Sequence, residues 1–375
     1  MSGKENRTKE QSVKIVIAGG GTGGHIFPAI AIANAIKKLA PETEFLFVGA
    51  KGRMEMEKVP QAGYKIKGLD IAGFNRRSLI KNIGLPYKLV KSFYQVSQVF
   101  KAFQPDAVIG VGGYSSYPVL RYAQSKNIPT FIHESNSFAG KSNIMLGKKA
   151  RIIFTATDHM QQFFPADKIM LTGNPVRQTI SHSTLTHDEG LNYFELDRVK
   201  KTVLVIGGSL GARTINEAID KNIDLIEKNN LQLIWQTGKP YFERAKSVVK
   251  DKTGVFMSDF IAQMEYAYAA ADIVISRSGA MAVAELCLVE KPVIFVPYPF
   301  AAEDHQTANA SALVEKNAAL MVKDSDAVNE LVPVLLNLVK DEIKENELKN
   351  NIAALGINNA DETIAMRVLE AINKV

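Results

Sequence analysis

The sequence predicts an α/β protein made of two Rossmann-like halves, each with a doubly wound parallel sheet. Three observations predict this fold: a length of 375 residues, apolar runs that alternate with helical patterns throughout, and two glycine-rich loops of the same construction. The first loop spans residues 19–25 (GGGTGGH) and the second spans residues 207–213 (GGSLGAR). Each follows a β-branched apolar run and precedes a helical pattern, an order that points backbone N–H groups and a helix N-terminus at an anion. We therefore expect two halves that face one cleft.

The first half alternates strand and helix patterns after the first loop. The expected strands are 13–18, 44–48, 65–69, 106–111, 130–133 and 152–155. Helical patterns cover 26–39 and 79–103, and Pro86 should interrupt the second. A short strand near Leu171 should break at Asn174 and Pro175, and the polar segment 181–190 is typical of a linker.

The pattern restarts near Thr202 and repeats the α/β alternation. The expected strands are 203–206, 231–236, 254–257, 273–276, 293–297 and 319–322. The expected helices are 214–229, 241–249, 264–271, 280–289, 307–316, 327–339 and 361–372. From its pattern alone, the closing helix could pack on either half. No short-period repeat or low-complexity tract interrupts this duplication.

Composition favours a soluble globular protein in a reducing compartment. Apolar residues make up 46% and charged residues 22%, no run of about 18 apolar residues occurs, and the polar N-terminal segment has no apolar signal core. The single cysteine, Cys287, cannot form an internal disulfide, and we expect it to pack in the core. Residues 1–150 hold 22 Lys/Arg and 9 Asp/Glu, a balance of +13, whereas the remainder holds 23 and 30, a balance of −7. Nucleic acid, anionic lipid or solvated lysines without a partner would each fit the basic half.

The first loop matches G-x-G-x-x-G, which raises a dinucleotide site as one hypothesis. A dinucleotide site needs an acidic residue at the end of the second strand to bind the ribose hydroxyls. Residues 47–52 (FVGAKG) contain no acidic residue, so a nicotinamide cofactor is disfavoured. His25 follows the glycines at a helix N-terminus. The helix dipole there favours the neutral imidazole, which could act as a base, although a capping role is the simpler alternative.

Polar residues also follow several other strands. In the second half, the loop with Ser209 and Arg213 would suit a diphosphate, or it could be only a tight turn. Glu285 lies two helical turns after Ser278 and could accept both hydroxyls of a ribose, or be merely solvated. His133, Glu134 and Asn136 together favour a position in a cleft, although His133 alone could be a core residue. Glu303–Gln306 add polar groups beyond the end of another strand. Asp324 and Asp326 match a D-x-D metal motif but are expected to cap a helix, and no P-loop or G-x-S-x-G motif is present.

Seven motifs together resemble one family. They are residues 19–25, 110–114 (GVGGY), 133–136 (HESN), 173–177 (GNPVR), 207–213, 276–279 (SRSG) with Glu285, and 304–306 (DHQ). Their order over about residues 13–310 resembles the MurG family of UDP-N-acetylglucosamine–N-acetylmuramyl-(pentapeptide) pyrophosphoryl-undecaprenol N-acetylglucosamine transferases. The resemblance implies a GT-B fold, inverting chemistry, no metal and no cofactor. It also implies an acceptor and membrane domain at 1–177, a UDP-GlcNAc domain at 178–357, and a closing helix at about 358–375 that returns to the first domain.

The resemblance also implies roles for individual residues. His25 is the expected base and Glu134 the alternative, while Tyr114 and His133 line the acceptor side. The residues expected to bind UDP-GlcNAc are Thr22, Gly23, Gly24, Asn136, Arg177, Ser209, Ile261, Met264, Glu285, His305 and Gln306. This chain has Ser135 and Leu210 where many relatives have glutamine, so neither receives a side-chain role.

The implied reaction transfers GlcNAc to the 4-hydroxyl of the muramyl unit of lipid I and gives lipid II. The implied partners are UDP-GlcNAc, lipid I, an anionic membrane surface and cell-wall synthesis proteins, without nucleic acid. Residues 74–91 mix apolar and basic side chains and would suit a peripheral site on the cytoplasmic face of the inner membrane, although they could also form an ordinary amphipathic helix. Rival functions are a diacylglycerol-type UDP-sugar transferase, a UDP-GlcNAc 2-epimerase and a non-catalytic nucleotide-sugar binding protein.

Overall fold

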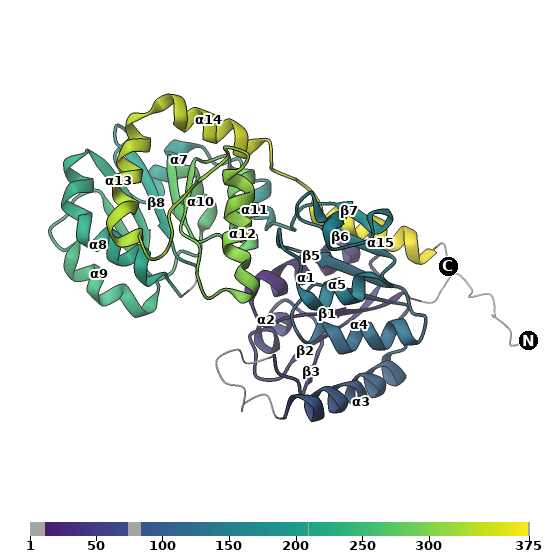
Figure 1. Cartoon of the computed structure of the whole chain (residues 1–375). Coiled ribbons are helices and arrows are strands. Elements are labelled where there is room, and N and C mark those ends of the chain that lie inside the picture. Colours follow the sequence, from purple (N-terminus) through teal and green to yellow (C-terminus); the bar gives the residue numbers. More distant parts are fainter. Residues whose placement is uncertain (1–11, 74–83, 209, 374–375) are drawn as a thin grey trace, which may run out of the picture. The chain divides into compact units, whose positions relative to one another are not determined.

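The chain folds into two compact α/β units (Figure 1). The computed structural model describes residues 12–73, 84–208 and 210–373. Unit 1 runs to Pro175 and also includes the chain from Asn359 onward, whereas unit 2 runs from Val176 to Asn358. Each unit has a fully parallel sheet with helices on both faces, which confirms the predicted fold class.

The sheet of unit 1 has the strand order β3-β2-β1-β4-β5-β6-β7. Its strands are β1 (Lys14–Ala18), β2 (Glu44–Ala50), β3 (Ile66–Leu69), β4 (Ala107–Gly110), β5 (Thr130–Glu134), β6 (Ile152–Thr155) and β7 (Ile169–Leu171). The sequence predicted the first six within three residues at each end. Because these strands run parallel, the carboxyl ends of β1, β4 and β5 lie at the same edge of this sheet.

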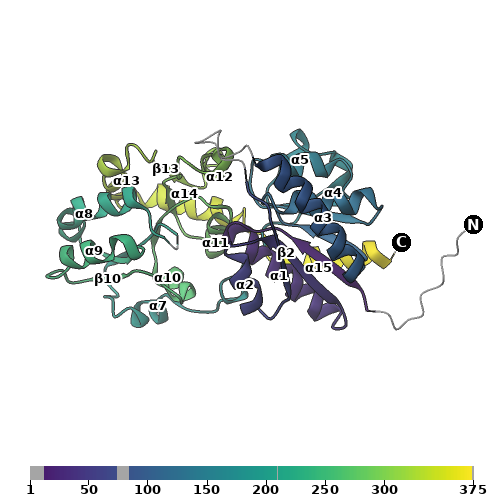
Figure 2. The ribbon, with the colours of Figure 1, turned by 90° about the horizontal axis from the view of Figure 1, so that it is seen from below.

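Alternating strand residues bury the two faces of this sheet. Ile15 and Ile17 face α1 (Gly23–Leu39) and α15 (Ala360–Asn373), while Val16 and Ala18 face the other layer. The helices of that other layer are α3 (Leu85–Phe103), α4 (Ser116–Ser125) and α5 (Lys141–Gly147). Helices α1 and α15 lie side by side (Figure 2), so the closing helix packs within unit 1.

One helix prediction for unit 1 is wrong, and three short helices were not predicted. Pro86 lies in the first turn of α3, where its missing N–H costs nothing, so it starts this helix rather than interrupting it. Residues 79–83 of the predicted helix lie outside the described residues. The sequence patterns also missed α2 (Glu55–Gln61), α4 and α5, which have only seven to ten residues each.

The sheet of unit 2 has the order β10-β9-β8-β11-β12-β13. Its strands are β8 (Lys201–Ile206), β9 (Leu231–Gln236), β10 (Val255–Ser258), β11 (Ile273–Ser276), β12 (Val293–Phe295) and β13 (Leu320–Met321). Counted within the unit, this is the order 3-2-1-4-5-6, which the first six strands of unit 1 also follow and which defines Rossmann sheets. The duplication inferred from the two glycine loops is therefore confirmed.

On one face of this sheet, Trp235 of β9 lies in a core that also contains residues of α8 (Arg213–Lys228), α9 (Phe242–Val248) and α13 (Ala327–Lys340). The helices of the other face are α6 (Gln178–Ser181), α7 (His187–Tyr193), α10 (Met264–Ala270), α11 (Ala280–Val289) and α12 (His305–Val314). A further helix, α14 (Glu342–Ala353), places Leu348 in the first core and Ile352 in the second. Cys287 packs in the second core as expected, and burial raises its thiol pKa to about 12.

The predicted linker at 181–190 is only partly correct, because α7 begins inside it. Thr186 accepts the backbone N–H of Glu189, and the Glu189 carboxylate accepts the backbone N–H of Thr186. This reciprocal capping box satisfies two N–H groups of the first helical turn. The polar residues of segment 181–190 thus include the start of α7, although their composition is typical of a loop.

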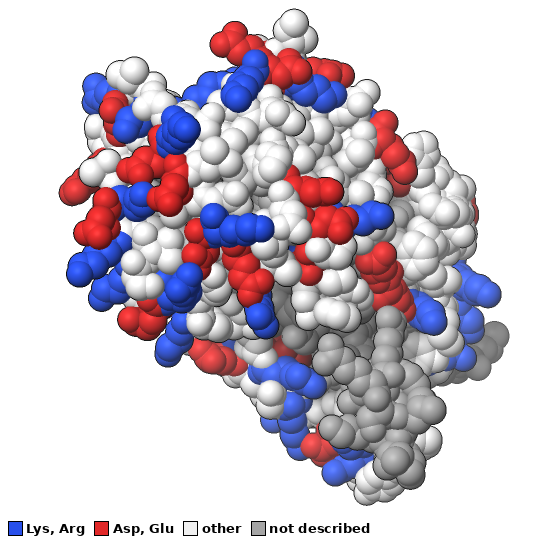
Figure 3. All heavy atoms as spheres, turned by 60° about the vertical axis from the view of Figure 1, so that its left-hand side comes forward, with Lys and Arg blue, Asp and Glu red and all other residues white. Residues whose placement is uncertain are grey.

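Charged side chains of both signs are interspersed on the face shown in Figure 3. The acidic surplus of residues 151–375 is therefore not gathered into a single patch on this face. Within the described ranges, no helix combines the length and the apolar character needed to cross a membrane.

Candidate functional site

The first glycine loop already holds an anionic group of the protein itself. Glu55, at the start of α2, is only 1% exposed, and its Oε2 accepts the backbone N–H of Gly21 at 2.9 Å. Its Oε1 accepts the N–H of Ala50 at the end of β2, also at 2.9 Å. A dinucleotide phosphate would compete with this carboxylate for the Gly21 N–H. The Glu55 contact therefore argues against a dinucleotide site here, in agreement with the sequence.

His25 lies in the first turn of α1, directly beside the same loop. Its Nδ1 is 3.1 Å from the carbonyl oxygen of Gly20 and 3.4 Å from the hydroxyl of Thr22. Because a carbonyl can only accept, Nδ1 carries the hydrogen, and Nε2 then has the basic lone pair. The ring packs on Gly112, where an added Cβ would come within 2.8 Å of Nε2.

Tyr114 belongs to the loop after β4 and lies close to the first glycine loop. An added Cβ on Gly21 would lie 3.9 Å from the Tyr114 ring, and an added Cβ on Gly73 would come within 2.9 Å of it. The phenol oxygen accepts a hydrogen bond from Arg53 Nε at 3.0 Å. Thr22 occupies the N-cap of α1 and Gly23 and Gly24 its first turn, so these residues adjoin His25. The structure thus brings the predicted residues of loops 19–25 and 110–114 together.

Glu134 organises the loop that follows β5. The carboxylate is 3% exposed and accepts four hydrogen bonds. Its Oε1 binds the backbone and side-chain N–H groups of Asn136 at 3.1 and 3.2 Å, and its Oε2 binds Gly140 N at 3.0 Å and Asn143 Nδ2 at 2.8 Å. Both oxygens are therefore engaged in holding residues 134–143. These contacts favour a positioning role for Glu134 over proton transfer.

His133 is fully buried at the end of β5. Its Nε2 lies 3.3 Å from the carbonyl of Gly173, and its Nδ1 lies 3.4 Å from the hydroxyl of Ser135. Burial lowers the pKa of His133 to about 4, so the ring is neutral near pH 7. The Asn174 amide also donates to the carbonyl of Ser135, at 3.0 Å. His133 thus joins the β5 loop to the segment after β7. Its complete burial agrees with the alternative that His133 is a core residue.

The second glycine loop, after β8, is held by contacts that the sequence did not reveal. Gly211 has a φ of +75° and lies so close to the chain after β9 that an added Cβ would overlap the carbonyl oxygen of Thr237. Gln236 bridges this loop and the predicted base pocket: its Nε2 donates to Gly208 O at 3.0 Å, and its Oε1 accepts Ile261 N–H at 2.9 Å. Ile261 and Met264 are both buried. Ser209 lies outside the described residues.

Arg177, Glu285 and Tyr268 form one polar cluster within unit 2. Arg177 Nη2 donates to Glu285 Oε1 at 3.2 Å, and the Tyr268 hydroxyl donates to Glu285 Oε2 at 2.9 Å. Burial raises the pKa of Glu285, while Arg177 and Tyr268 oppose that rise. Burial, with the neighbouring Glu285 charge, also raises the pKa of Tyr268 well above its usual value. Two predicted ligand residues, Arg177 and Glu285, are therefore adjacent, and Tyr268 is a partner that sequence reasoning missed.

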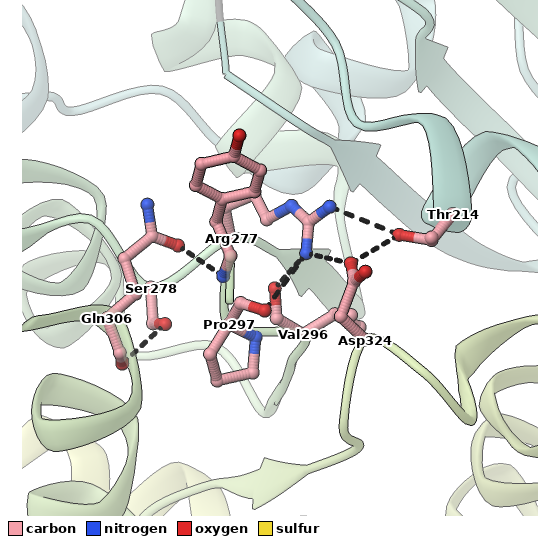
Figure 4. A network of polar contacts seen from close by, with 8 residues as sticks. Thr214, Arg277, Ser278, Val296, Pro297, Gln306 and Asp324 are labelled. Carbon is pink, nitrogen blue, oxygen red and sulfur yellow. Dashed lines mark hydrogen bonds and ion pairs between the residues drawn. The ribbon is translucent and has the colours of Figure 1, made fainter. Parts of the chain in front are cut away.

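Arg277, in the predicted motif 276–279, ties together four segments at the carboxyl edge of the unit 2 sheet (Figure 4). Its Nη1 donates to Asp324 Oδ1 at 2.6 Å and to the carbonyls of Val296 and Pro297 at 2.9 and 3.1 Å. Its Nη2 donates to the Thr214 hydroxyl at 3.1 Å. The guanidinium thus fixes the loops after β11 and β12 to the first turn of α8 and the segment before α13.

The predicted capping role of Asp324 and Asp326 is wrong in its chemistry. Asp326 does occupy the N-cap position of α13 but makes no side-chain cap hydrogen bond, and Asp324 pairs with Arg277. Among the described residues, no group of three or more His, Cys, Asp or Glu side chains is arranged to hold a metal ion.

Gln306 and His305 begin α12. The Gln306 side-chain carbonyl accepts the N–H of Tyr298 at 2.9 Å, and its backbone carbonyl accepts the Ser278 hydroxyl at 2.8 Å (Figure 4). His305 Nε2 lies 3.6 Å from the carboxylate of Glu303. Glu303 and Asp304 both have φ values above +50°, a conformation that costs energy for residues with side chains and is concentrated at functional sites.

Each unit has a Rossmann sheet with a glycine-rich loop after its first strand. Comparison with known families identifies the class of protein with this fold as the glycosyltransferases. The N-terminal domain model of glycosyltransferase family 28 matches residues 15–155, and the C-terminal domain model of the same family matches residues 202–364. Together these matches cover most of both units.

Individual relatives identify the family more narrowly. The chain is 50% identical to the UDP-N-acetylglucosamine–N-acetylmuramyl-(pentapeptide) pyrophosphoryl-undecaprenol N-acetylglucosamine transferase of Phocaeicola vulgatus, over 97% of this chain and 98% of the relative. It is also 50% identical to the protein of that name from Bacteroides thetaiotaomicron, over 96% and 98%. The crystal structure of Acinetobacter baumannii MurG superposes with a TM-score of 0.78 at 28% identity, over 97% of this chain and all of that one. The chain therefore belongs to the MurG family of N-acetylglucosamine transferases.

Proposed function

We propose that this enzyme transfers GlcNAc from UDP-GlcNAc to the 4-hydroxyl of the muramyl unit of lipid I, which gives lipid II for peptidoglycan synthesis. The observation that carries the proposal is the 50% identity, over nearly the whole chain, to transferases named for this donor sugar and this lipid-linked acceptor. In the reaction, the muramyl oxygen forms a bond to the anomeric carbon as that carbon's bond to UDP breaks. Attack opposite the leaving group inverts the anomeric centre and gives a β-1,4 link.

Unit 2 is proposed to bind the donor. Glu285 would accept the ribose hydroxyls, and Arg177 and Ser209 would hold the diphosphate. Ile261 and Met264, which are both buried, would contact uracil. This division is supported by the Gly21 N–H in unit 1, which already binds Glu55. Gln306, His305 and, in unit 1, Asn136 would contact the GlcNAc hydroxyls.

Unit 1 is proposed to bind lipid I and to supply the base. His25 would take the proton of the muramyl hydroxyl on Nε2, since the Gly20 carbonyl fixes the hydrogen on Nδ1. Tyr114, Thr22, Gly23 and Gly24 adjoin His25 and would contact the reacting groups. Because its two oxygens already accept four hydrogen bonds, Glu134 would position Asn136 rather than accept a proton, and His133 would fix the same loop.

We also propose a peripheral membrane location at the cytoplasmic face of the inner membrane, as a lipid-linked acceptor requires. On α3, Tyr87, Val90 and Tyr94 are 72%, 71% and 66% exposed, and their spacing of three and four residues places them on one helix face. Lys88 and Lys91 flank them. Residues 74–83 of the predicted membrane segment lie outside the described residues. Contacts with other cell-wall synthesis proteins remain part of this proposal.

The test is UDP release from UDP-GlcNAc, measured with and without a lipid I analogue, together with detection of the disaccharide product. We expect UDP release only with the acceptor, and a much lower kcat with little change in the KM for UDP-GlcNAc for His25→Ala. Conversion of UDP-GlcNAc to a 2-epimerised sugar without the acceptor would instead indicate an epimerase. UDP-GlcNAc binding without turnover would indicate a non-catalytic protein, and an unchanged kcat for His25→Ala would remove His25 from its role.

A further inference from the structure

The buried carboxylate of Glu55 has no part in the function proposed above. It binds two backbone N–H groups, of Gly21 and Ala50, and so joins the first glycine loop to the end of β2. Carboxylates that accept backbone N–H groups form strong, charge-assisted hydrogen bonds. Glu55 therefore holds the loop beside His25 in one conformation.

Two glycines leave the space that this carboxylate occupies. A Cβ on Gly20 would overlap the carboxyl group of Glu55, and a Cβ on Gly49 would come within 2.5 Å of its Cγ. Gly20 also has a φ of +146°, which side chains disfavour. The close fit indicates a built contact between Glu55 and the loop rather than a chance approach of a surface side chain.

The peptide group between Gly20 and Gly21 connects Glu55 to His25. Its N–H donates to Glu55 Oε2 at 2.9 Å, and its carbonyl accepts from His25 Nδ1 at 3.1 Å. The N–H and the carbonyl of a planar trans peptide point in opposite directions, so the carboxylate and the imidazole lie on opposite sides of one rigid group. A hydrogen bond to the N–H polarises the peptide and makes its carbonyl a stronger acceptor.

We propose that Glu55 is a positioning residue for the transferase reaction and acts on His25 through the Gly20–Gly21 peptide. The carboxylate fixes the orientation of this peptide, and the Gly20 carbonyl then holds the hydrogen of His25 on Nδ1. Nε2 is thereby kept as the nitrogen that accepts the proton of the acceptor hydroxyl. The inference rests on the proposed function of His25 as base.

The test compares Glu55→Gln and Glu55→Asp with a matched control, Glu57→Gln. Glu57 lies on the same helix, but its side chain is 68% exposed. Glutamine can satisfy only one of the two N–H groups, because its amide would turn a donor toward the other. We expect Glu55→Gln to lower kcat by about 10- to 100-fold, the range found for outer partners that orient metal-ligating histidines. The Kd for UDP should stay within about twofold, since UDP is assigned to unit 2, and Glu55→Asp should retain part of the activity.

The tautomer of His25 provides a second test, because a purely structural role of Glu55 would leave this tautomer unchanged. Nitrogen-15 NMR of the six histidines reports which nitrogen of a neutral imidazole carries the hydrogen, and His25→Ala assigns the signal. We expect Nδ1–H in the native protein and a shift toward Nε2–H in Glu55→Gln. This measurement on the native protein needs no Glu55 variant to fold.

Three results would overturn the inference: an Nε2–H tautomer in the native protein, a full kcat in Glu55→Gln, or a loss of kcat with an unchanged tautomer. Failure of the proposed function looks different, because the native protein itself would then show no acceptor-dependent UDP release. Failure of His25 as the base would leave His25→Ala with its full kcat. If His25→Ala is inactive while Glu55→Gln is fully active, only the role of Glu55 is wrong.

Discussion

Arg177 and Glu285, the residues proposed for two different parts of the nucleotide, bind each other through Nη2 and Oε1 at 3.2 Å. The Arg177 side chain is 46% exposed, whereas that of Glu285 is only 12% exposed. Each residue therefore holds the other near its ligand-binding place. When the nucleotide binds, ribose hydroxyls would donate to Glu285 while Arg177 turns to the phosphates.

The first prediction concerns Glu285→Gln. An amide cannot replace a carboxylate as the acceptor of two ribose hydroxyls, and hydrogen bonds to a charged group contribute about 1.5–3 kcal/mol. We expect the Kd for UDP, measured by calorimetry, to rise by at least about tenfold. For 2′,3′-dideoxy-UDP, which has no hydroxyls to donate, the native and variant proteins should bind alike. An equal loss for both nucleotides would contradict the ribose assignment.

The second prediction concerns Tyr268→Phe. Loss of the phenol leaves Glu285 Oε2 without its donor and should raise the pKa of Glu285, which burial has already raised. UDP binding should therefore weaken, and more strongly as the pH falls, because the carboxyl group becomes protonated. In a double-mutant cycle with Glu285→Gln, the effect of Tyr268→Phe should nearly vanish. Fully additive effects would show that Tyr268 does not act through Glu285.

Periodicity and glycine punctuation predicted the sheets because their signals are local. The predicted bounds of β9 and α11, for example, are those observed, and each combines an apolar run with a clear turn after it. The short helix α2 escaped because seven residues carry too little periodicity, and Pro60 inside it suggests a loop. A residue such as Pro86 is ambiguous from sequence, since the same proline can begin or break a helix.

The candidate site was predictable only where the residues belong to recognised loops. Residues 47–52 at the end of β2 hold no carboxylate, and Glu55 follows three positions after Gly52. Its partner Gly21 is 34 positions away in the sequence. Arg277 likewise binds Asp324, which is 47 positions away. Long-range partners of this kind have no local pattern. The capping preference of Asp therefore gave the wrong chemistry for Asp324.

The third prediction is a pH dependence of stability set by His133. Its native pKa is about 4, below the 6.5 of an unfolded histidine, so between these values the unfolded state binds more protons. Stability should therefore be fully present above about pH 6.5 and fall as the pH drops toward 4, by about 1.4 kcal/mol per unit of pKa difference. His133→Gln, which does not titrate, should reduce this slope in urea titrations followed by circular dichroism. An identical slope in both proteins would count against a buried neutral His133.

The fourth prediction concerns the Arg277–Asp324 pair, whose side chains are 11% and 17% exposed. Asp324→Asn leaves a nearly buried guanidinium without its counter-charge, which typically costs about 3–5 kcal/mol. The single tryptophan, Trp235, lies in the core of unit 2, so its fluorescence during urea unfolding follows this unit. Asp326→Asn is the matched control, because the Asp326 side chain accepts a hydrogen bond from the hydroxyl of the adjacent Ser325, and it should change stability by less than about 0.5 kcal/mol. Equal stability of the two variants would contradict the network in Figure 4.

The fifth prediction concerns the exposed face of α3 formed by Tyr87, Val90 and Tyr94. Tyrosines favour the boundary between water and lipid, and each basic residue beside an anionic membrane contributes about 1 kcal/mol. The protein should float with anionic vesicles at low salt and less at high salt, and changing these three residues to serine should reduce flotation at both. Ile343→Ser removes an apolar side chain of unit 2 that is 85% exposed, and it should leave flotation unchanged. UDP release with a water-soluble acceptor analogue should be unchanged in the triple variant, since α3 is assigned to the membrane and not to the reaction. Absence of binding to anionic vesicles at low salt, or equal flotation of the triple variant and the native protein, would exclude this face as the membrane contact.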